Sequence, residues 1–296
     1  MKKIVWILLF FVGVLTTQVD ASDSRKGDDS DSRCGNRKSF VKNDQLTIFA
    51  LTADQRLLKF RECNPTRAYQ IGSVYGLQAS DYRLVGIDFR VQDGQLYGVG
   101  NGGGIYTIDT NTAVATLVSQ LMVPLDGYFF GVDFNPAANA LRIISNTGQN
   151  LRHPFAGPLM FQTQNDGTLN YPGPPIVNPA TGLTGAAYTN NDLDPNTGTT
   201  LYDIDTSLNQ VAIQSPPNAG SLVATGLLTV DPDSPVGFDI YTTLKDGVAI
   251  NNSGFASLVV GGMPGFYRVN FPTGQAFLID YFRDPVIDIA IPLNQD

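Results

Sequence analysis

The chain has 296 residues, a net charge of −8 and charged side chains at only 16% of positions. Its 30 glycines, 18 prolines and single glutamate, Glu62, exclude a long-helix or coiled-coil protein and favour strands joined by many turns. The acidic balance argues against nucleic acid as a partner, and one histidine with two cysteines cannot build a four-ligand zinc site of the Cys/His kind.

The N-terminus has the pattern of a secretory signal peptide. Lys2 and Lys3 precede an apolar run over 4–15, and Val19-Asp20-Ala21 places small or apolar residues where a signal peptidase needs them. We therefore expect a signal peptide over 1–21, the alternative being an N-terminal membrane anchor. The run is too short to span a bilayer, and no membrane span is expected after cleavage. The sequence predicts a secreted or extracellular protein, or a periplasmic one in a Gram-negative bacterium.

The segment 22–43 is almost free of apolar residues and is expected to be a flexible leader to a domain over 44–296. Cys34 lies in this leader, and Cys63 lies in the first segment with strand character. In an oxidising compartment two lone cysteines most simply pair, so we expect a Cys34–Cys63 disulfide; two unpaired thiols are the alternative.

The domain contains a repeat of about 50 residues. Each unit begins with an apolar strand, and all but one copy of that strand carries an aspartate. The copies are Val85-Gly86-Ile87-Asp88-Phe89, Phe130-Gly131-Val132-Asp133-Phe134, Thr184-Gly185-Ala186-Ala187-Tyr188, Val236-Gly237-Phe238-Asp239-Ile240 and Pro285-Val286-Ile287-Asp288-Ile289. A second element recurs at 105–110, 201–206, 266–270 and 57–61, and an apolar strand ends the unit at 113–118, 222–225, 276–279 and 68–71.

Short strands repeated at this interval are typical of a β-propeller. We expect an all-β fold with five blades, or six if 155–182 holds a degenerate one; the alternative is a β-sandwich with an internal duplication. The chain ends with the first strand of a unit, at 285–291, and its first strand, at 45–51, matches a later strand of one. The two terminal strands are therefore expected to pair and close the ring.

The repeated aspartates Asp88, Asp133, Asp239 and Asp288 admit two interpretations. If the strands that carry them are innermost, the carboxylates surround the central channel and form an oxygen-only cation site of the kind that calcium takes. Alternatively, each carboxylate accepts a hydrogen bond from a backbone amide of the neighbouring blade, and its repetition favours this structural role.

A second calcium candidate is the segment 192–203. Asp192, Asp194 and Asn196 place oxygen ligands at positions 1, 3 and 5 of a calcium loop, and Asp203 stands at position 12. The glycine comes one position late, and Asp replaces the usual terminal Glu. The same residues are also good turn formers, so a plain hairpin turn is the alternative.

The most polar part of the domain is 135–153, and it supplies the candidate ligand-binding residues. Side-chain amides and two arginines close together could bind a sugar or another polar ligand through paired hydrogen bonds. Alternatively, the arginines pair with blade aspartates and the amides cap turns. His153 ends the segment, and no Gly-x-Ser-x-Gly motif accompanies it, which argues against a nucleophilic hydrolase. The candidates are Arg142, Asn146, Gln149, Asn150 and Arg152, with Asn190 and Asn191 from the next unit.

The sequence resembles a secreted family, domain of unknown function 4394. The resemblance is carried by 131–136, continuing through 141–143 to 147–152, and by 187–191, 200–205, 215–220 and 237–240. Together these stretches cover nearly all of 45–291. The resemblance implies an exported, propeller-like protein and no assigned activity. One departure is Ala140, where the family pattern has an acid before Leu141-Arg142.

Three functions follow from these observations. The first is a secreted binding or scaffold propeller with an extracellular glycan or protein as ligand. The second is a calcium-dependent propeller enzyme, such as a lactonase or a glycan lyase, with the metal in the channel. The third is a structural component of the extracellular matrix, tethered through the leader.

Overall fold

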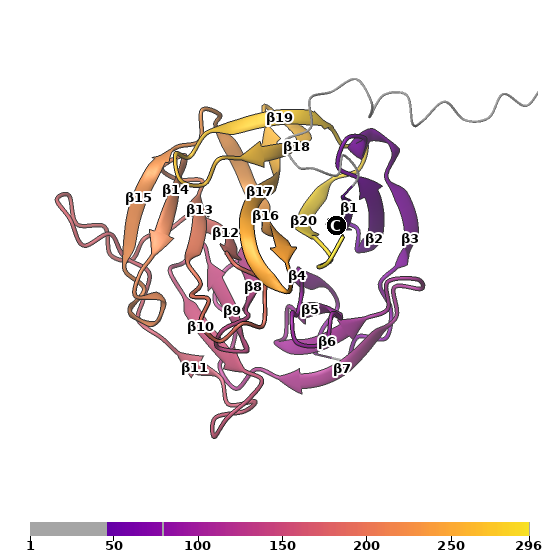
Figure 1. Cartoon of the computed structure of the whole chain (residues 1–296), viewed down its shortest axis with the longest axis horizontal. Helices are drawn as coiled ribbons and strands as arrows, with labels where there is room; N and C mark the ends of the chain where they lie inside the picture. The colour runs from indigo at the N-terminus through magenta and orange to yellow at the C-terminus, as the bar shows by residue number, and fades with distance from the viewer. Residues whose placement is uncertain (1–45, 79, 296) are drawn as a thin grey trace, which may run out of the picture.

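The computed structural model describes residues 46–78 and 80–295. The expected signal peptide, the leader and Cys34 of the expected disulfide lie outside these residues. Within them, five four-stranded antiparallel sheets surround a common axis, which confirms the five-bladed β-propeller (Figure 1). No described segment forms a helix with the length and apolar character needed to cross a bilayer.

The blades are numbered from the one that both chain ends build. Blade one consists of β20 (Val286–Ala290), β1 (Thr47–Thr52), β2 (Arg56–Arg61) and β3 (Tyr69–Ser73). Blade two consists of β4 (Leu84–Phe89), β5 (Leu96–Gly100), β6 (Gly104–Ile108) and β7 (Ala115–Gln120). Blade three consists of β8 (Phe130–Asn135), β9 (Ala140–Ser145), β10 (Asn150–Pro154) and β11 (Gln164–Asn165). Blade four consists of β12 (Leu183–Tyr188), β13 (Leu201–Asp205), β14 (Gln210–Gln214) and β15 (Leu222–Leu227). Blade five consists of β16 (Pro232–Lys245), β17 (Val248–Val260), β18 (Met263–Val269) and β19 (Ala276–Tyr281). Two short 3₁₀ helices, η2 (Pro65–Arg67) and η3 (Pro217–Ala219), lie in connections.

The ring is closed by the two terminal strands, as expected. In blade one, β1 pairs antiparallel with β20, so that Phe49 lies opposite Ala290. The side chain of Gln295 strengthens this junction, because its Oε1 accepts from Thr47 N at 2.7 Å and its Nε2 donates to Thr47 O at 3.0 Å. Pairing the chain ends removes the open edges that an incomplete ring would expose.

Each of the five apolar clusters fills the space between two adjacent blades. The cluster between blades three and four, for example, joins Ile144 of β9 to Leu183 of β12 and Leu201 of β13. The innermost strands β4 and β12 are buried at every position. A blade therefore buries both faces against its neighbours, and the closed ring serves as one continuous core.

The repeated glycine of the innermost strands is explained by this close packing. A Cβ atom at Gly131 would stand 2.7 Å from the backbone nitrogen of Ala186 in blade four. At Gly237 it would stand 2.5 Å from Cα of Asp288 in blade one. Backbone atoms cannot give way as a flexible side chain can, so the inner strands meet only where a side chain is absent.

Two finer expectations are settled by the strand order. The segment 155–182 forms no sixth blade; it supplies β11 as the outer strand of blade three and a long connection to blade four. The similar segments 105–110 and 201–206 do not occupy equivalent positions, because the first lies in β6, third in its blade, and the second lies in β13, second in its blade. The similarity of the two segments in sequence therefore does not correspond to the same place in the sheet.

Candidate functional site

The four repeated aspartates lie on innermost strands and reach across to the next blade. The carboxylate of Asp288 accepts from Ile87 N at 2.8 Å, and that of Asp88 accepts from Phe134 N at 2.7 Å. Asp133 accepts from Tyr188 N at 3.0 Å, and Asp239 accepts from Ile291 N at 2.6 Å. These are the inter-blade hydrogen bonds of the structural interpretation. Blade four has Ala187 at the corresponding place, so its junction with blade five lacks this contact.

Three of these carboxylates also approach one another. Oxygens of Asp88, Asp133 and Asp239 lie within 4.8 Å of each other, and among the described residues this is the acidic group close enough to hold a metal ion. Burial, and then the charge of the other aspartates, raises the pKa of Asp88 and Asp133 well above its ordinary value. Burial raises the pKa of Asp239 to about 7. The group can thus avoid mutual repulsion by binding protons or by binding a cation.

The expected calcium loop at 192–203 is built as a turn. Asp192 Oδ1 accepts from Asp194 N and its Oδ2 accepts from Ala249 N at the start of β17, while Asp194 Oδ1 accepts from Asn196 N. Asp203, which would have closed the loop, is fully buried within β13. The acidic side chains of this segment are not among those that the described structure brings within metal-binding distance.

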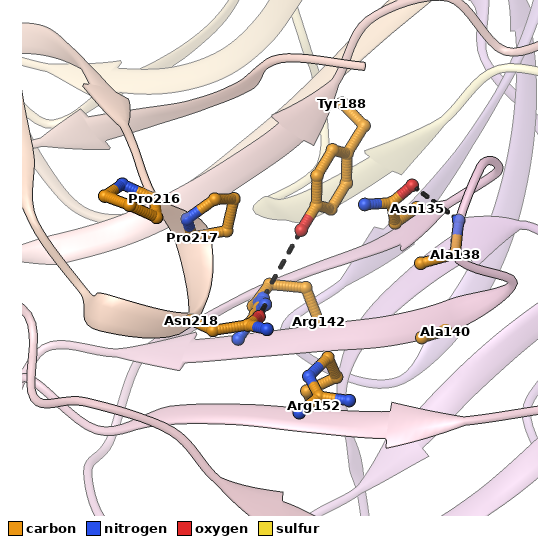
Figure 2. A pocket seen from close by; sticks show the side chains of 9 residues that line it. All are labelled: Asn135, Ala138, Ala140, Arg142, Arg152, Tyr188, Pro216, Pro217 and Asn218. Atoms are coloured by element: carbon orange, nitrogen blue, oxygen red, sulfur yellow. Dashed lines mark hydrogen bonds between the residues drawn. The ribbon is translucent and has the colours of Figure 1, made fainter. Parts of the chain in front are cut away.

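A pocket of about 270 Å³ lies between blades three and four (Figure 2). One wall comes from β9, β10, the end of β12 and the turn after β8, and the other comes from the connection that contains η3. Figure 2 shows the guanidinium of Arg142, the amide of Asn218 and the hydroxyl of Tyr188 pointing toward one another. The residues that line the pocket are Asn135, Ala138, Ala140, Arg142, Arg152, Tyr188, Pro216, Pro217 and Asn218.

Arg142 is the fixed centre of this site. Its side chain is only 2% exposed, yet its guanidinium is held on several sides. Nη1 donates to Asn150 Oδ1 at 2.8 Å and to Asp166 Oδ2 at 2.9 Å, while Nη2 donates to Asn218 Oδ1 at 2.7 Å. Burial lowers the pKa of Arg142, but the nearby Tyr188 and Asp166 outweigh that effect, so the pKa is raised overall. The result is a permanent, immobilised cation at the wall of the pocket.

Asp166 is the counter-ion that two arginines share. Its Oδ2 accepts from Arg142 and also from Arg152 Nε at 3.0 Å, and its Oδ1 accepts from Arg152 Nη2 at 3.3 Å. Arg152 of β10 lies directly opposite Arg142 of β9 in the antiparallel strand pair. The side chain of Arg152 is 25% exposed, so its outer end reaches solvent in the pocket.

Behind Arg142, blade four contributes a second buried acid, Asp203. Its two carboxyl oxygens have no hydrogen-bond partner among the described residues, and the same is true of Oε1 of Gln214. Burial raises the pKa of Asp203 well above its ordinary value, although the charge of Arg142 acts in the opposite direction. The surroundings of Asp203 therefore disfavour the charged form of its carboxyl.

Of the seven residues expected to bind a ligand, Arg142 and Arg152 line the pocket and Asn150 supports Arg142 from behind. The other four amides hold loops in place. Asn146 and Gln149 bind the backbone of 124–129, and Asn190 and Asn191 bind β16 and β17. The interpretation of side-chain amides as turn and loop anchors thus applies to these four.

The structure places three residues at the site that the sequence did not predict. Asp166 lies in the long connection after β10, whereas Tyr188 belongs to the next blade and Asn218 to the segment Ser215–Gly220. The strongest available signal was that last segment, because two consecutive prolines before an asparagine fix a rigid turn. Nothing in the sequence indicated that this turn would face Arg142, which is 76 residues away.

His153 is a core residue outside the pocket lining. It is fully buried, stacks on Phe161, and binds the hydroxyls of Ser119 and Thr163 at 3.0 Å through its two ring nitrogens. Burial lowers the pKa of His153 to about 4. The ring is therefore neutral at physiological pH and serves packing.

The model of one protein family, described as domain of unknown function (DUF4394), matches residues 56–290. The chain belongs to this family. The match confirms the resemblance drawn from the sequence, and the DUF4394 description assigns no activity. No curated protein matches the chain.

Several solved structures are similar to the chain at low sequence identity. A protein of unknown function from Bacteroides thetaiotaomicron is 13% identical, with a TM-score of 0.49 over 88% of this chain and 70% of that one. An auxiliary nutrient binding protein from Bacteroides ovatus is 13% identical, with a TM-score of 0.42 over 80% of this chain and 57% of that one. TolB from Acinetobacter baumannii is 8% identical, with a TM-score of 0.42 over 84% and 67% of the two chains.

Proposed function

We propose that this DUF4394 protein is an exported binding propeller that takes one unit of an extracellular glycan into the pocket between blades three and four. The observation that carries the proposal is the immobilised guanidinium of Arg142, held by Asp166 and Asn218 at the pocket wall. Prearranged hydrogen-bonding groups in a concave site lose little freedom when a ligand binds, and this favours affinity.

The remaining features of the pocket agree with this role. A volume of about 270 Å³ is just below the usual range of small-molecule sites, so the pocket suits one sugar ring rather than a long segment of chain. The apolar faces of Tyr188, Pro216 and Pro217 lie beside the polar groups, as a sugar with one apolar face requires. An exported location rests on the predicted signal peptide over 1–21.

The experiment is a glycan-binding screen with a blocking variant and a matched control. Ala138 is exposed at the pocket, so Ala138→Trp fills the cavity without removing any member of the Arg142 network. The adjacent Ala137 is exposed and outside the lining, so Ala137→Trp adds the same bulk elsewhere. We expect Ala138→Trp to abolish binding and Ala137→Trp to retain it. Binding that survives Ala138→Trp would exclude this pocket.

A calcium-dependent enzyme is a second candidate, favoured by the approach of Asp88, Asp133 and Asp239 in the channel. Oxygen ligands of this kind suit calcium. Thermal unfolding of residues 22–296 in excess calcium and in excess chelator tests it. A cation bound by the folded state alone stabilises by about 2.7 kcal/mol at a hundredfold excess over Kd. Equal unfolding midpoints in the two buffers would exclude calcium binding, and this candidate function with it.

A further inference from the structure

We propose that the pocket between blades three and four recognises a carboxylate, so that the preferred ligand unit is an acidic sugar of the uronic acid class. This inference rests on the proposed function, because it names the chemical class of ligand for the same site. It depends on which hydrogen-bonding groups around the pocket are already used and which are still available.

The donors of the pocket exceed what the protein itself uses. A guanidinium carries five N–H groups, and Arg142 uses four of them, toward Tyr188, Asn150, Asp166 and Asn218. Arg152 uses Nε and one Nη2 hydrogen toward Asp166, and its Nη1 has no hydrogen-bond partner among the described residues.

The amide of Asn218 shows the same imbalance. Its oxygen accepts from Arg142, which orients the group, and its nitrogen has no hydrogen-bond partner within the described part of the chain. Because the Asn218 side chain is exposed at the rim, this nitrogen can donate to a ligand. Donors therefore reach the pocket from both blade three and the η3 connection.

The acceptor atoms of Asp166 and Asn135, by contrast, already accept hydrogen bonds from the protein. Both oxygens of Asp166 bind arginine, and Oδ1 of Asn135 accepts from Ala138 N at 3.0 Å and from Thr199 at 3.3 Å. The flanking Pro216 and Pro217 have no backbone N–H and contribute apolar surface. A neutral sugar hydroxyl both donates and accepts, whereas a carboxylate only accepts. The available donors therefore match a carboxylate better than a neutral sugar.

The charges of the described side chains at the site favour the same ligand. Arg142 and Arg152 carry two positive charges, and Asp166 supplies one negative charge between them. Burial raises the pKa of Asp203, which lies behind Arg142, and so disfavours its charged form. Arg142, Arg152 and Asp166 together thus carry one excess positive charge, in a protein whose net charge is −8. An arginine fork paired with a carboxylate gives geometric selection as well as attraction.

The test compares three ligands that differ at one group. Glucuronate, glucuronamide and glucose share a ring, and they carry a carboxylate, a neutral amide and a hydroxymethyl group at the same carbon. Binding to the full chain is measured by titration calorimetry and by ligand-observed NMR, with acetate and sulfate as further probes of simple anion binding. The variants are Arg152→Gln and Ala138→Trp, with Ala137→Trp as the control. Arg152→Gln leaves Asp166 paired with Arg142, so the fold is preserved.

We expect glucuronate to bind at least about tenfold more tightly than glucuronamide or glucose, a preference that Arg152→Gln removes and added salt weakens. If all three sugars bind equally and Arg152→Gln changes nothing, the carboxylate preference is wrong and the glycan-binding function remains. If acetate and sulfate bind as well as glucuronate, the site holds simple anions and the sugar class is wrong. If no ligand binds, or if binding survives Ala138→Trp, the proposed function fails and this inference fails with it.

Discussion

Replacing Asp239 by Asn tests whether the channel aspartates are neutral in the folded protein. Asn retains an Oδ1 that can accept from Ile291 N, so the inter-blade hydrogen bond persists while the ionisable group is removed. Any loss of the second contact, from Ile240 N to the other carboxyl oxygen, affects stability equally at every pH. The pH dependence of the difference between variant and wild type therefore reports the ionisation of Asp239 and its effect on Asp88 and Asp133.

The expected magnitude follows from the pKa of Asp239, which burial raises from 3.8 to about 7. A carboxyl whose pKa is higher in the folded state than in the unfolded state binds more protons when folded, so the stability of the wild type falls as pH rises between these values. The loss is absent below pH 3.8 and reaches about 4 kcal/mol above pH 7. Between pH 4 and pH 8, the free energy of unfolding of Asp239→Asn should rise by about 4 kcal/mol relative to that of the wild type.

The assay is guanidinium unfolding in chelator from pH 4 to pH 8, with Asp233→Asn as the matched control. Asp233 lies on the same strand, β16, and its side chain is exposed, so its replacement should leave the pH dependence of the wild type unchanged. Parallel stability profiles for Asp239→Asn and wild type would refute the reasoning. A gain that appears in chelator and reverses in calcium would show that the ring binds a cation instead of protons.

Three further predictions concern the core. Arg142→Met should lower the free energy of unfolding by about 3–5 kcal/mol, because it removes the buried guanidinium from which Asp166, Asn150 and Asn218 accept hydrogen bonds. Arg142→Lys should lower it less, and thermal unfolding distinguishes the two variants. His153→Gln should make the stability of the fold less sensitive to acid. The pKa of His153 is about 4 in the folded protein and 6.5 ordinarily, so the free energy of unfolding of the wild type falls by up to about 3 kcal/mol as pH drops from 6.5 to 4. An equal fall in the variant would contradict this. Gly237→Ala should cost about 1–3 kcal/mol in urea unfolding, because its Cβ meets the backbone of Asp288, whereas Gly198→Ala, with open space around it, should be neutral.

Much of the fold could be predicted because a propeller repeats the same physical requirement. Each innermost strand needs apolar residues on both faces and, at most junctions, a glycine where it meets the next blade, so 85–89, 130–134 and 236–240 look alike. The complementary strands at the two chain ends predicted the β1–β20 pairing for the same reason. The second repeated element was less informative, because similar sequences at 105–110 and 201–206 form the third strand of one blade and the second strand of another.

The candidate site was predicted only in part. Arg142 and Arg152 stood out because two cations in a polar segment of an acidic, charge-poor chain are unusual. Asn146, Gln149, Asn190 and Asn191 were selected for the same polarity, and the structure uses them to hold loops. A side-chain amide serves a ligand or a turn equally well, and composition cannot distinguish the two uses.

By itself, the sequence indicated the class of fold and the closure of the ring, because both depend on periodicity along the chain, and it indicated the family through specific stretches such as 131–136. The choice between five and six blades needed the strand order. The tertiary structure decided which polar groups meet. Asp166, Tyr188 and Asn218 reach Arg142 from three separate segments, and the distance between them in sequence carries no information about their approach. The inter-blade hydrogen bonds of the repeated aspartates also belong to the tertiary structure, because such a bond exists only once the ring brings one blade against the next.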